Sequence, residues 1–102
     1  NDIIAQVASD AATAAGMREK IFIVGTDGLG GAGLGIEGLR ANIIDATLYH
    51  PYLVDLAWRI IERHQTDPNF KPKARYEFEA LVITSGVLDD LQRKGYPPAP
   101  PL

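Results

Sequence analysis

Asp27 is the residue whose type and position most favour ligand binding. It follows the apolar run 21–24 and precedes Gly28, a turn residue. A short apolar run closed by turn residues is typical of a strand buried on both faces of a parallel sheet, and ligands bind at the carboxyl ends of such strands. A carboxylate there can accept hydrogen bonds from two adjacent hydroxyl groups, as sugars present them. Because Asp-Gly is also a common turn dipeptide, a binding role and a turn role for Asp27 are equally open.

Three other residues could contribute to the same site. Asn1 offers both a donor and an acceptor, which polyols require, although a helix N-cap is the more common role of such a residue. Tyr49 and His50 follow the second apolar stretch, so parallel strands would bring them to the edge that carries Asp27. The Tyr49 ring could stack on a sugar or donate its hydroxyl. His50 could contact a ligand, but an N-cap or surface role is the more common alternative.

A glycine-rich stretch over residues 28–33 supports a competing interpretation. Its residues match the G-x-G-x-x-G pattern of dinucleotide-binding proteins. That pattern should follow the strand directly, whereas Thr26 and Asp27 intervene here, and the Asp27 carboxylate would lie beside the pyrophosphate. Asp45 comes too early for the acidic residue that is expected roughly 20 positions later. A chance match is the preferred interpretation in a chain with 10 glycines, and no nucleotide cofactor is expected.

Neither a catalytic set nor a metal site is evident in the sequence. Ser9 and Ser85 have no histidine at a recognisable spacing, and the G-x-S-x-G pattern is absent. His50 and His64 stand far apart in different settings, and by themselves they make no metal site. We therefore expect a binding protein without catalytic residues, metal or cofactor.

Length and composition indicate one small globular domain. The chain has 102 residues, a hydrophobic fraction of 46% and a net charge of −3. This charge argues against a nucleic-acid surface, because phosphate binding needs clustered Lys and Arg. No apolar run approaches the roughly 20 residues that span a bilayer. Cysteine is absent, which fits a protein outside the cytoplasm without requiring one. Because the chain begins with Asn1 and enters a helix at once, we expect it to be cut from a longer protein.

Apolar periodicity predicts an alternation of helices and strands. Helices are expected over residues 1–15, 32–40, 51–64 and 85–94, and strands over residues 21–24, 41–48 and 75–83. This order predicts an α/β fold with parallel strands. Residues 96–102 are rich in proline and should form extended polyproline. Their PxxP pattern matches groove-binding peptides, although a solvated chain end is more common.

Three sequence blocks in this order resemble the type I periplasmic sugar-binding proteins, of which the ribose-binding proteins are the best-known members. The blocks are Asn1-Asp2-Ile3-Ile4-Ala5 at the start of a helix, Ile23-Val24-Gly25-Thr26-Asp27-Gly28 one strand later, and Ile44-Asp45-Ala46-Thr47-Leu48-Tyr49-His50-Pro51 before a proline-initiated helix. The resemblance covers residues 1–91. The effector domains of lactose-repressor-type regulators share this fold.

The resemblance implies a fold and a set of ligand-binding residues. The expected architecture is α/β, a Rossmann-like three-layer fragment with a mostly parallel sheet from a two-lobed periplasmic-binding-protein fold. Asn1 and Asp27 match family positions that hydrogen-bond sugar hydroxyls. Thr26 matches a neighbouring position that is often aromatic. Tyr49 or His50 falls near a hinge position that is often held by an amide or an acid.

The resemblance also implies a domain assignment. By analogy, residues 1–48 belong to the C-terminal lobe and residues 51–83 to the N-terminal lobe, while residues 85–94 form a returning helix and residues 95–102 a proline-rich tail. The ligand would be closed between the two lobes by hinge motion. This segment would lack the start of both lobes, so its exposed strand edges and apolar faces should favour self-association.

The implied function is that of the solute-binding component of an ABC-type transport system in the periplasm. The partners would be a small sugar or polyol and a membrane permease, with no nucleic acid bound through this segment. An effector-binding domain of a lactose-repressor-type transcription regulator is the alternative. A nucleotide-binding enzyme domain ranks below both.

Overall fold

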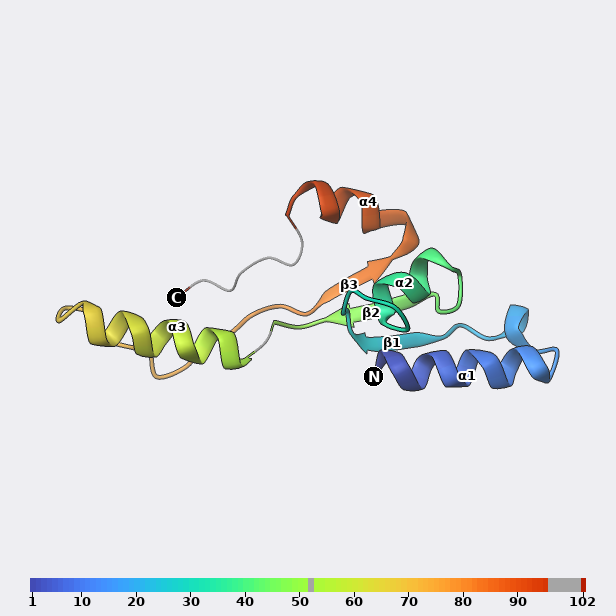
Figure 1. Ribbon diagram of the computed structural model, residues 1–102, viewed down its shortest axis with the longest axis horizontal. Coiled ribbons are helices and arrows are strands. Elements are labelled where there is room, and N and C mark those ends of the chain that lie inside the picture. The colour runs from blue at the N-terminus through green and yellow to red at the C-terminus, as the bar shows by residue number, and fades with distance from the viewer. Residues whose placement is uncertain (52, 96–101) are drawn as a thin grey trace.

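The computed structural model describes residues 1–51, 53–95 and 102. Along the chain it contains α1 (Asp2–Ala14), the 3-10 turn η1 (Arg18–Lys20), β1 (Val24–Asp27), α2 (Gly35–Arg40), β2 (Ala46–Tyr49), α3 (Leu53–Thr66), β3 (Leu81–Thr84) and α4 (Ser85–Arg93) (Figure 1). The predicted alternation of helices and strands is confirmed. The predicted polyproline segment and its PxxP pattern lie outside the described residues, apart from Leu102.

Local sequence explains where α1 begins and how it packs. The side-chain oxygen of Asn1 accepts a hydrogen bond of 3.0 Å from the amide of Ile4, which satisfies one of the donors that a helix N-terminus leaves unpaired. The buried face carries Ala5, Ser9 and Ala12, spaced by four and three residues as helix geometry requires. Because these side chains are small, α1 can pack closely against β1.

The three strands form one sheet in the order β1-β2-β3. β1 and β2 are parallel, with Asp27 opposite Tyr49, whereas β2 and β3 are antiparallel, with Tyr49 opposite Leu81. The prediction of parallel strands is therefore wrong for β3. Figure 1 shows the physical reason, because β2 leads the chain outward to α3 and β3 leads it back along the same path. A strand that returns directly beside its neighbour must run in the opposite direction.

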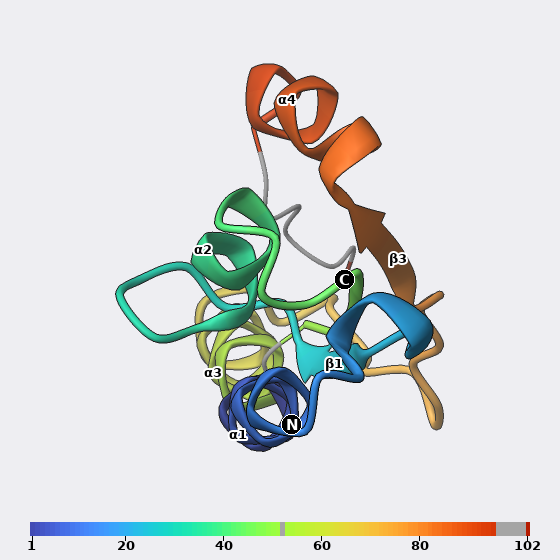
Figure 2. The same ribbon diagram turned by 90° about the vertical axis from the view of Figure 1, so that its right-hand side faces the viewer.

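Helices cover one face of this sheet. Gly25, Thr47 and Ile83 occupy one register position across the three strands, and Thr47 and Ile83 are completely buried. Helices α1, α2 and α4 pack on this side (Figure 2), where their apolar residues join those of the strands in one core. The core consists of Ala5, Ala12, Ile23, Ile36, Leu39, Ile44, Tyr49, Ile83 and Leu88.

The other face of the sheet is largely exposed along its two outer strands, and this corrects the prediction for the first strand. Val24 and Val82 point to that face and are 48% and 56% exposed. Phe22, just before β1, is 71% exposed, whereas Ile23 is buried at 7%. The expected strand over residues 21–24, buried on both faces, is therefore wrong in two respects. The strand begins at Val24 and ends at Asp27, and only one of its faces is covered. Apolar residue type predicted that these side chains favour burial, but no described helix covers them.

Three other elements are shorter than predicted. The strand expected over residues 41–48 is reduced to β2, which begins only at Ala46 and ends at Tyr49. α2 begins only at Gly35, because the glycines before it form a loop in which Gly31 and Gly33 adopt positive φ angles of 123° and 75°. Residues 75–80 are not part of the sheet, since the paired segment begins at Leu81. Alternating charged and apolar residues predicted a strand there, but a strand also needs a neighbour with which to exchange hydrogen bonds.

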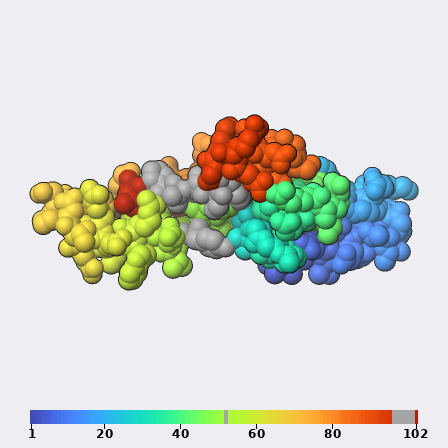
Figure 3. Space-filling view, turned by 45° about the horizontal axis from the view of Figure 1, so that its top comes forward, coloured from blue at the N-terminus to red at the C-terminus, as the bar shows by residue number. Residues whose placement is uncertain are grey.

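The molecule is elongated because α3 stands apart from the sheet. We call residues 53–80 the arm, and α1, η1, β1, α2, β2, β3 and α4 the body. The arm lies at one end of the molecule and the body at the other (Figures 1 and 3). Overall dimensions are 60 × 25 × 21 Å, and the radius of gyration is 17.2 Å, against about 13 Å for a compact chain of this length.

Candidate ligand-binding site

Asp27 lies at the carboxyl end of β1 in an uncommon backbone conformation. Its φ angle is 117°, a region that costs a residue with a side chain about 1–3 kcal/mol. Such strain is typically found at functional sites, where the surrounding structure holds the residue in place. The Asp27 side chain is 35% exposed, so its carboxylate remains accessible to a ligand. Both observations are compatible with a binding role, which stays a prediction for Asp27.

The structure brings His50 to the same edge, as the sequence predicted for parallel strands. His50 follows β2, and its Nε2 lies 3.5 Å from Oδ1 of Asp27. The His50 side chain is 55% exposed, so both partners face solvent. Together they present a carboxylate acceptor beside an imidazole that can donate or accept, which suits the neighbouring hydroxyl groups of a sugar.

Asn1 lies beside this edge, although part of its side chain already has a structural role. Figure 1 shows the N-terminus next to the end of β1. The Asn1 oxygen caps α1, as the more common interpretation of this residue predicted. The amide nitrogen is the other polar atom of the side chain and is the one with which a ligand could interact. A contact between Asn1 and a ligand stays a prediction.

The other two predicted residues are placed differently. Thr26 pairs with Leu48 across the parallel strands and is half-buried. Tyr49 is 6% exposed and belongs to the hydrophobic core, so the structure gives its ring a packing role. A contact between Tyr49 and a sugar, through its ring or its hydroxyl, stays a prediction.

The sequence did not reveal a buried carboxylate that is hydrogen-bonded to the residue after Asp27. Asp2, the first residue of α1, is 1% exposed. Its Oδ2 accepts a hydrogen bond of 2.9 Å from the amide of Gly28, and its Oδ1 accepts one of 2.6 Å from the hydroxyl of Thr47. The Gly28 amide also lies 3.2 Å from Oγ1 of Thr47. The carboxylate thus joins the start of α1 to the end of β1 and the middle of β2.

Two glycines provide the space for this carboxylate. A Cβ atom added at Gly25 or at Gly35 would overlap the side chain of Asp2. Gly25 lies in β1 and Gly35 begins α2, so the carboxylate is enclosed by two further elements. Glycines at a strand interior and at a helix start are the sequence signal that could have indicated a close packing partner. Their spacing alone does not say which residue fills the space.

The opposite end of the sheet is held by a different ion pair. Arg18 Nη2 lies 3.1 Å from Oδ2 of Asp45, and the same carboxylate oxygen accepts a 2.8 Å hydrogen bond from the amide of Ile23. Arg18 also donates to the carbonyl of Ile43 at 3.1 Å. Asp45 directly precedes β2, so this ion pair lies at the amino end of the strands. It has a structural partner there and is placed away from the glycine-rich loop.

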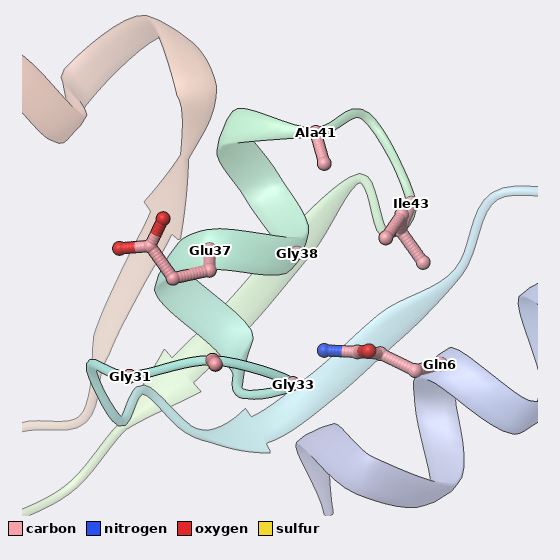
Figure 4. Close-up of a pocket in the computed structure, with 8 residues that line it drawn as sticks. Gln6, Gly31, Gly33, Glu37, Gly38, Ala41 and Ile43 are labelled. Atoms are coloured by element: carbon pink, nitrogen blue, oxygen red, sulfur yellow. The ribbon is translucent and has the colours of Figure 1, made fainter.

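The glycine-rich loop borders an open pocket between α1 and α2, with a volume of about 440 Å³. In Figure 4 the side chain of Gln6 points from α1 toward Gly33 and α2, and its Nε2 donates 3.1 Å to the carbonyl of Leu34. The lining residues are Gln6, Gly31, Ala32, Gly33, Glu37, Gly38, Ala41 and Ile43. None of the sequence-predicted ligand residues lines this pocket, so it is distinct from the edge with Asp27 and His50.

Two further observations concern the described residues as a whole. They contain no group of three His, Cys, Asp or Glu side chains placed to hold a metal ion. Among the described helices, none combines the length and the apolar character that crossing a membrane requires.

Comparison with known proteins relates the fold to one solved structure. No family model and no curated protein matches the chain. The fructose-binding periplasmic domain of a hybrid two-component system is similar, with a TM-score of 0.76 and 28% sequence identity. The match covers 92% of this chain and 31% of that one, so the chain spans about a third of its length. This match confirms the resemblance carried by the three sequence blocks: the chain has the α/β fold of the type I periplasmic binding proteins.

Proposed function

We propose that this chain is the sugar-binding segment of a periplasmic-binding-protein-like receptor, with Asp27 and His50 as ligand-binding residues. The observation that carries the proposal is the accessible pair at the carboxyl ends of β1 and β2, with 3.5 Å between Nε2 and Oδ1. Ligands of open α/β sheets bind at this edge. Support also comes from the similar solved structure, which is a fructose-binding domain.

Within this proposal the ligand is a small polyhydroxylated molecule. The Asp27 carboxylate accepts hydrogen bonds from two neighbouring hydroxyls, and His50 accepts or donates a third. The amide nitrogen of Asn1 donates to an adjacent hydroxyl oxygen. Thr26 has the weakest support, because it is half-buried and its position in the resemblance is often aromatic.

The arm is proposed to be part of a second lobe that closes over this edge. Leu53, Val54 and Trp58 on α3 are 63%, 82% and 67% exposed, as expected for a helix whose partner surface is elsewhere in a larger protein. The arm begins at Leu53, three residues after His50. The edge that carries Asp27 and His50 therefore lies close to the junction of the arm and the body. Hinge closure at this junction would bury the ligand.

Two biological roles fit a sugar-binding segment outside the cytoplasm. One is delivery of the sugar to the membrane permease of an ABC-type transporter. The other is sugar sensing, which is favoured by the similarity to a domain of a hybrid two-component system. The coding sequence on both sides of the chain distinguishes them. A histidine-kinase module in the same gene supports sensing, and a free-standing binding protein beside permease genes supports transport. A helix-turn-helix before Asn1 would contradict both roles and support the alternative of a transcription regulator.

The test of sugar binding uses the full-length protein and isothermal titration calorimetry. D-fructose, D-ribose, D-glucose and D-galactose are titrated into the wild-type protein and into Asp27→Ala. We expect one of the sugars to bind and Asp27→Ala to weaken its affinity by at least about 100-fold, because the variant loses two hydrogen bonds to a charged group and each contributes about 1.5–3 kcal/mol. The matched control is Asp10→Ala, which removes an exposed carboxylate from α1. Equal affinity of the wild-type protein and Asp27→Ala would refute the assignment.

A further expectation concerns the 102-residue chain by itself. β1 is an edge strand, and Val24 within it and Phe22 just before it are exposed by 48% and 71%. An unprotected edge with apolar neighbours favours strand pairing between copies. We propose that the isolated chain self-associates, which sedimentation velocity measures, and that Val24→Lys reduces this association. A strictly monomeric chain at high concentration would contradict the proposal.

A further inference from the structure

The hydrogen bonds of Asp2 converge on the peptide group that follows Asp27. The Gly28 amide donates to Oδ2 of Asp2 at 2.9 Å, and this amide belongs to the peptide bond whose carbonyl comes from Asp27. The orientation of that peptide plane therefore depends on a buried carboxylate in another element. Asp27 itself has a positive φ angle of 117°, a conformation that persists only when its surroundings determine it.

We propose that Asp2 is a positioning residue for ligand binding, and that it holds Asp27 in the conformation that presents its carboxylate to the sugar. This inference rests on the proposed sugar-binding function. Asp2 does not touch the ligand, because it is 1% exposed and its two oxygens already accept hydrogen bonds from Gly28 and Thr47. Its influence on affinity acts through the backbone of Asp27.

Thr47 extends this influence to the neighbouring strand. Its hydroxyl donates to Oδ1 of Asp2 at 2.6 Å and lies 3.2 Å from the Gly28 amide. Thr47 is completely buried and lies in β2, three residues before His50. One carboxylate thus ties together the strands that carry Asp27 and His50. The relative placement of these two side chains, on which recognition of adjacent hydroxyls depends, follows from that connection.

The surroundings of Asp2 leave it little freedom to move. Gly25 in β1 and Gly35 at the start of α2 both approach so closely that a Cβ on either would overlap the carboxylate. A carboxylate confined in this way can hold its partner in one orientation, because its own rotamer is restricted by packing. The position also places a negative charge at the N-terminus of α1, where the helix dipole favours it.

A double-mutant cycle in the full-length protein separates positioning from simple stabilisation. The variants are Asp2→Asn, Asp27→Asn and the double variant, each titrated with the sugar that the wild-type protein binds best among D-fructose, D-ribose, D-glucose and D-galactose. We expect Asp2→Asn to weaken binding at least 10-fold in the wild-type background. In the Asp27→Asn background the same change should weaken binding less than 3-fold, since interacting sites are non-additive.

Ser9→Ala is the matched control. Ser9 is also a buried polar residue on the inner face of α1, and its hydroxyl donates 2.6 Å to the carbonyl of Ile43, near the opposite end of the sheet. This substitution should lower the melting temperature while leaving sugar affinity unchanged. An equal loss of affinity in Ser9→Ala and Asp2→Asn, or additive losses in the cycle, would overturn the positioning role.

A second pair of variants keeps the test decisive if Asp2→Asn does not fold. Thr47→Ser retains the hydroxyl that donates to Asp2, whereas Thr47→Val removes it with little change of volume. We expect Thr47→Ser to bind within 3-fold of wild type and Thr47→Val to bind at least 5-fold more weakly. Equal affinity of these two variants refutes the proposal. A wild-type protein that binds none of the four sugars overturns the sugar-binding function itself, and the positioning role with it.

Discussion

The body and the arm use apolar residues of the same kind with opposite outcomes. In the body, Leu39, Ile44 and Ile83 are at most 2% exposed. In α3 the described residues include a single buried side chain, Leu56, while Val54 is 82% exposed. The difference shows that amphipathic spacing determines which face of a helix favours burial, but not whether a partner for that face exists within the same segment.

The contrast also bears on the candidate site. The body provides a rigid edge, because hydrogen bonds of Asp2 and Arg18 join its elements at both ends of the sheet. The arm begins directly beyond that edge and has little packing of its own. Under the proposed function, the segment between the body and the arm would act as the hinge that closes the second lobe over the ligand.

The largest effect is expected from Ile83→Ala in β3. Ile83 is completely buried in the core, and removing such a side chain typically destabilises a protein by about 2–5 kcal/mol. The neighbouring Val82→Ala serves as control, because Val82 is 56% exposed on the other face. Its truncation should lower the free energy of unfolding by less than about 1 kcal/mol. Urea denaturation measures both values. Equal losses would contradict the assignment of a covered and an open face.

A smaller loss of stability is expected from Gly35→Ala at the start of α2. The added Cβ would overlap the Asp2 carboxylate, and overpacking of this kind costs about 1–3 kcal/mol. In Gly30→Ala the added Cβ meets open space, so the change in unfolding free energy should stay within about 1 kcal/mol. Thermal unfolding of the two variants distinguishes them. A Gly35→Ala protein as stable as wild type would show that Asp2 has room to move.

Asn1→Ala tests how the first helix of the body is anchored. It removes the side-chain oxygen that accepts from the Ile4 amide, which typically costs about 0.5–2 kcal/mol. Asn1→Asp keeps a capping oxygen and should retain most of the stability. Comparing the two by chemical denaturation, and then by sugar titration, separates the two roles of this residue. A loss of affinity in Asn1→Asp at normal stability would assign the amide nitrogen to the ligand.

In the 102-residue chain, the smallest change in stability is expected from a substitution in the arm. Trp58 is 67% exposed, so Trp58→Ala in the 102-residue chain should change the free energy of unfolding by less than about 0.5 kcal/mol. In the full-length protein the proposed second lobe would bury this side chain, and the same change should then cost about 3–5 kcal/mol. If Trp58→Ala left the free energy of unfolding almost unchanged in both proteins, the proposal that a second lobe covers α3 would be contradicted.

Much of the site was predictable because it depends on local sequence. Asp27 and His50 each follow an apolar stretch, and a parallel pair of strands places such residues at one edge. The N-cap role of Asn1 follows equally from residue type. The buried position of Tyr49 did not follow, because an aromatic residue near a strand end can pack inward or outward with the same sequence.

The sequence by itself determined the alternation of helices and strands, the start of α1 and the residues at the carboxyl edge, because these depend on residue type and short-range periodicity. Only the tertiary structure decided the antiparallel direction of β3, the exposure of Val24, and the burial of Asp2 against Gly28 and Thr47. Each of these depends on contacts between residues far apart in the chain. Asp2 lies 26 positions before Gly28 and 45 before Thr47. A local sequence pattern cannot predict a hydrogen bond between residues that are so far apart in the chain.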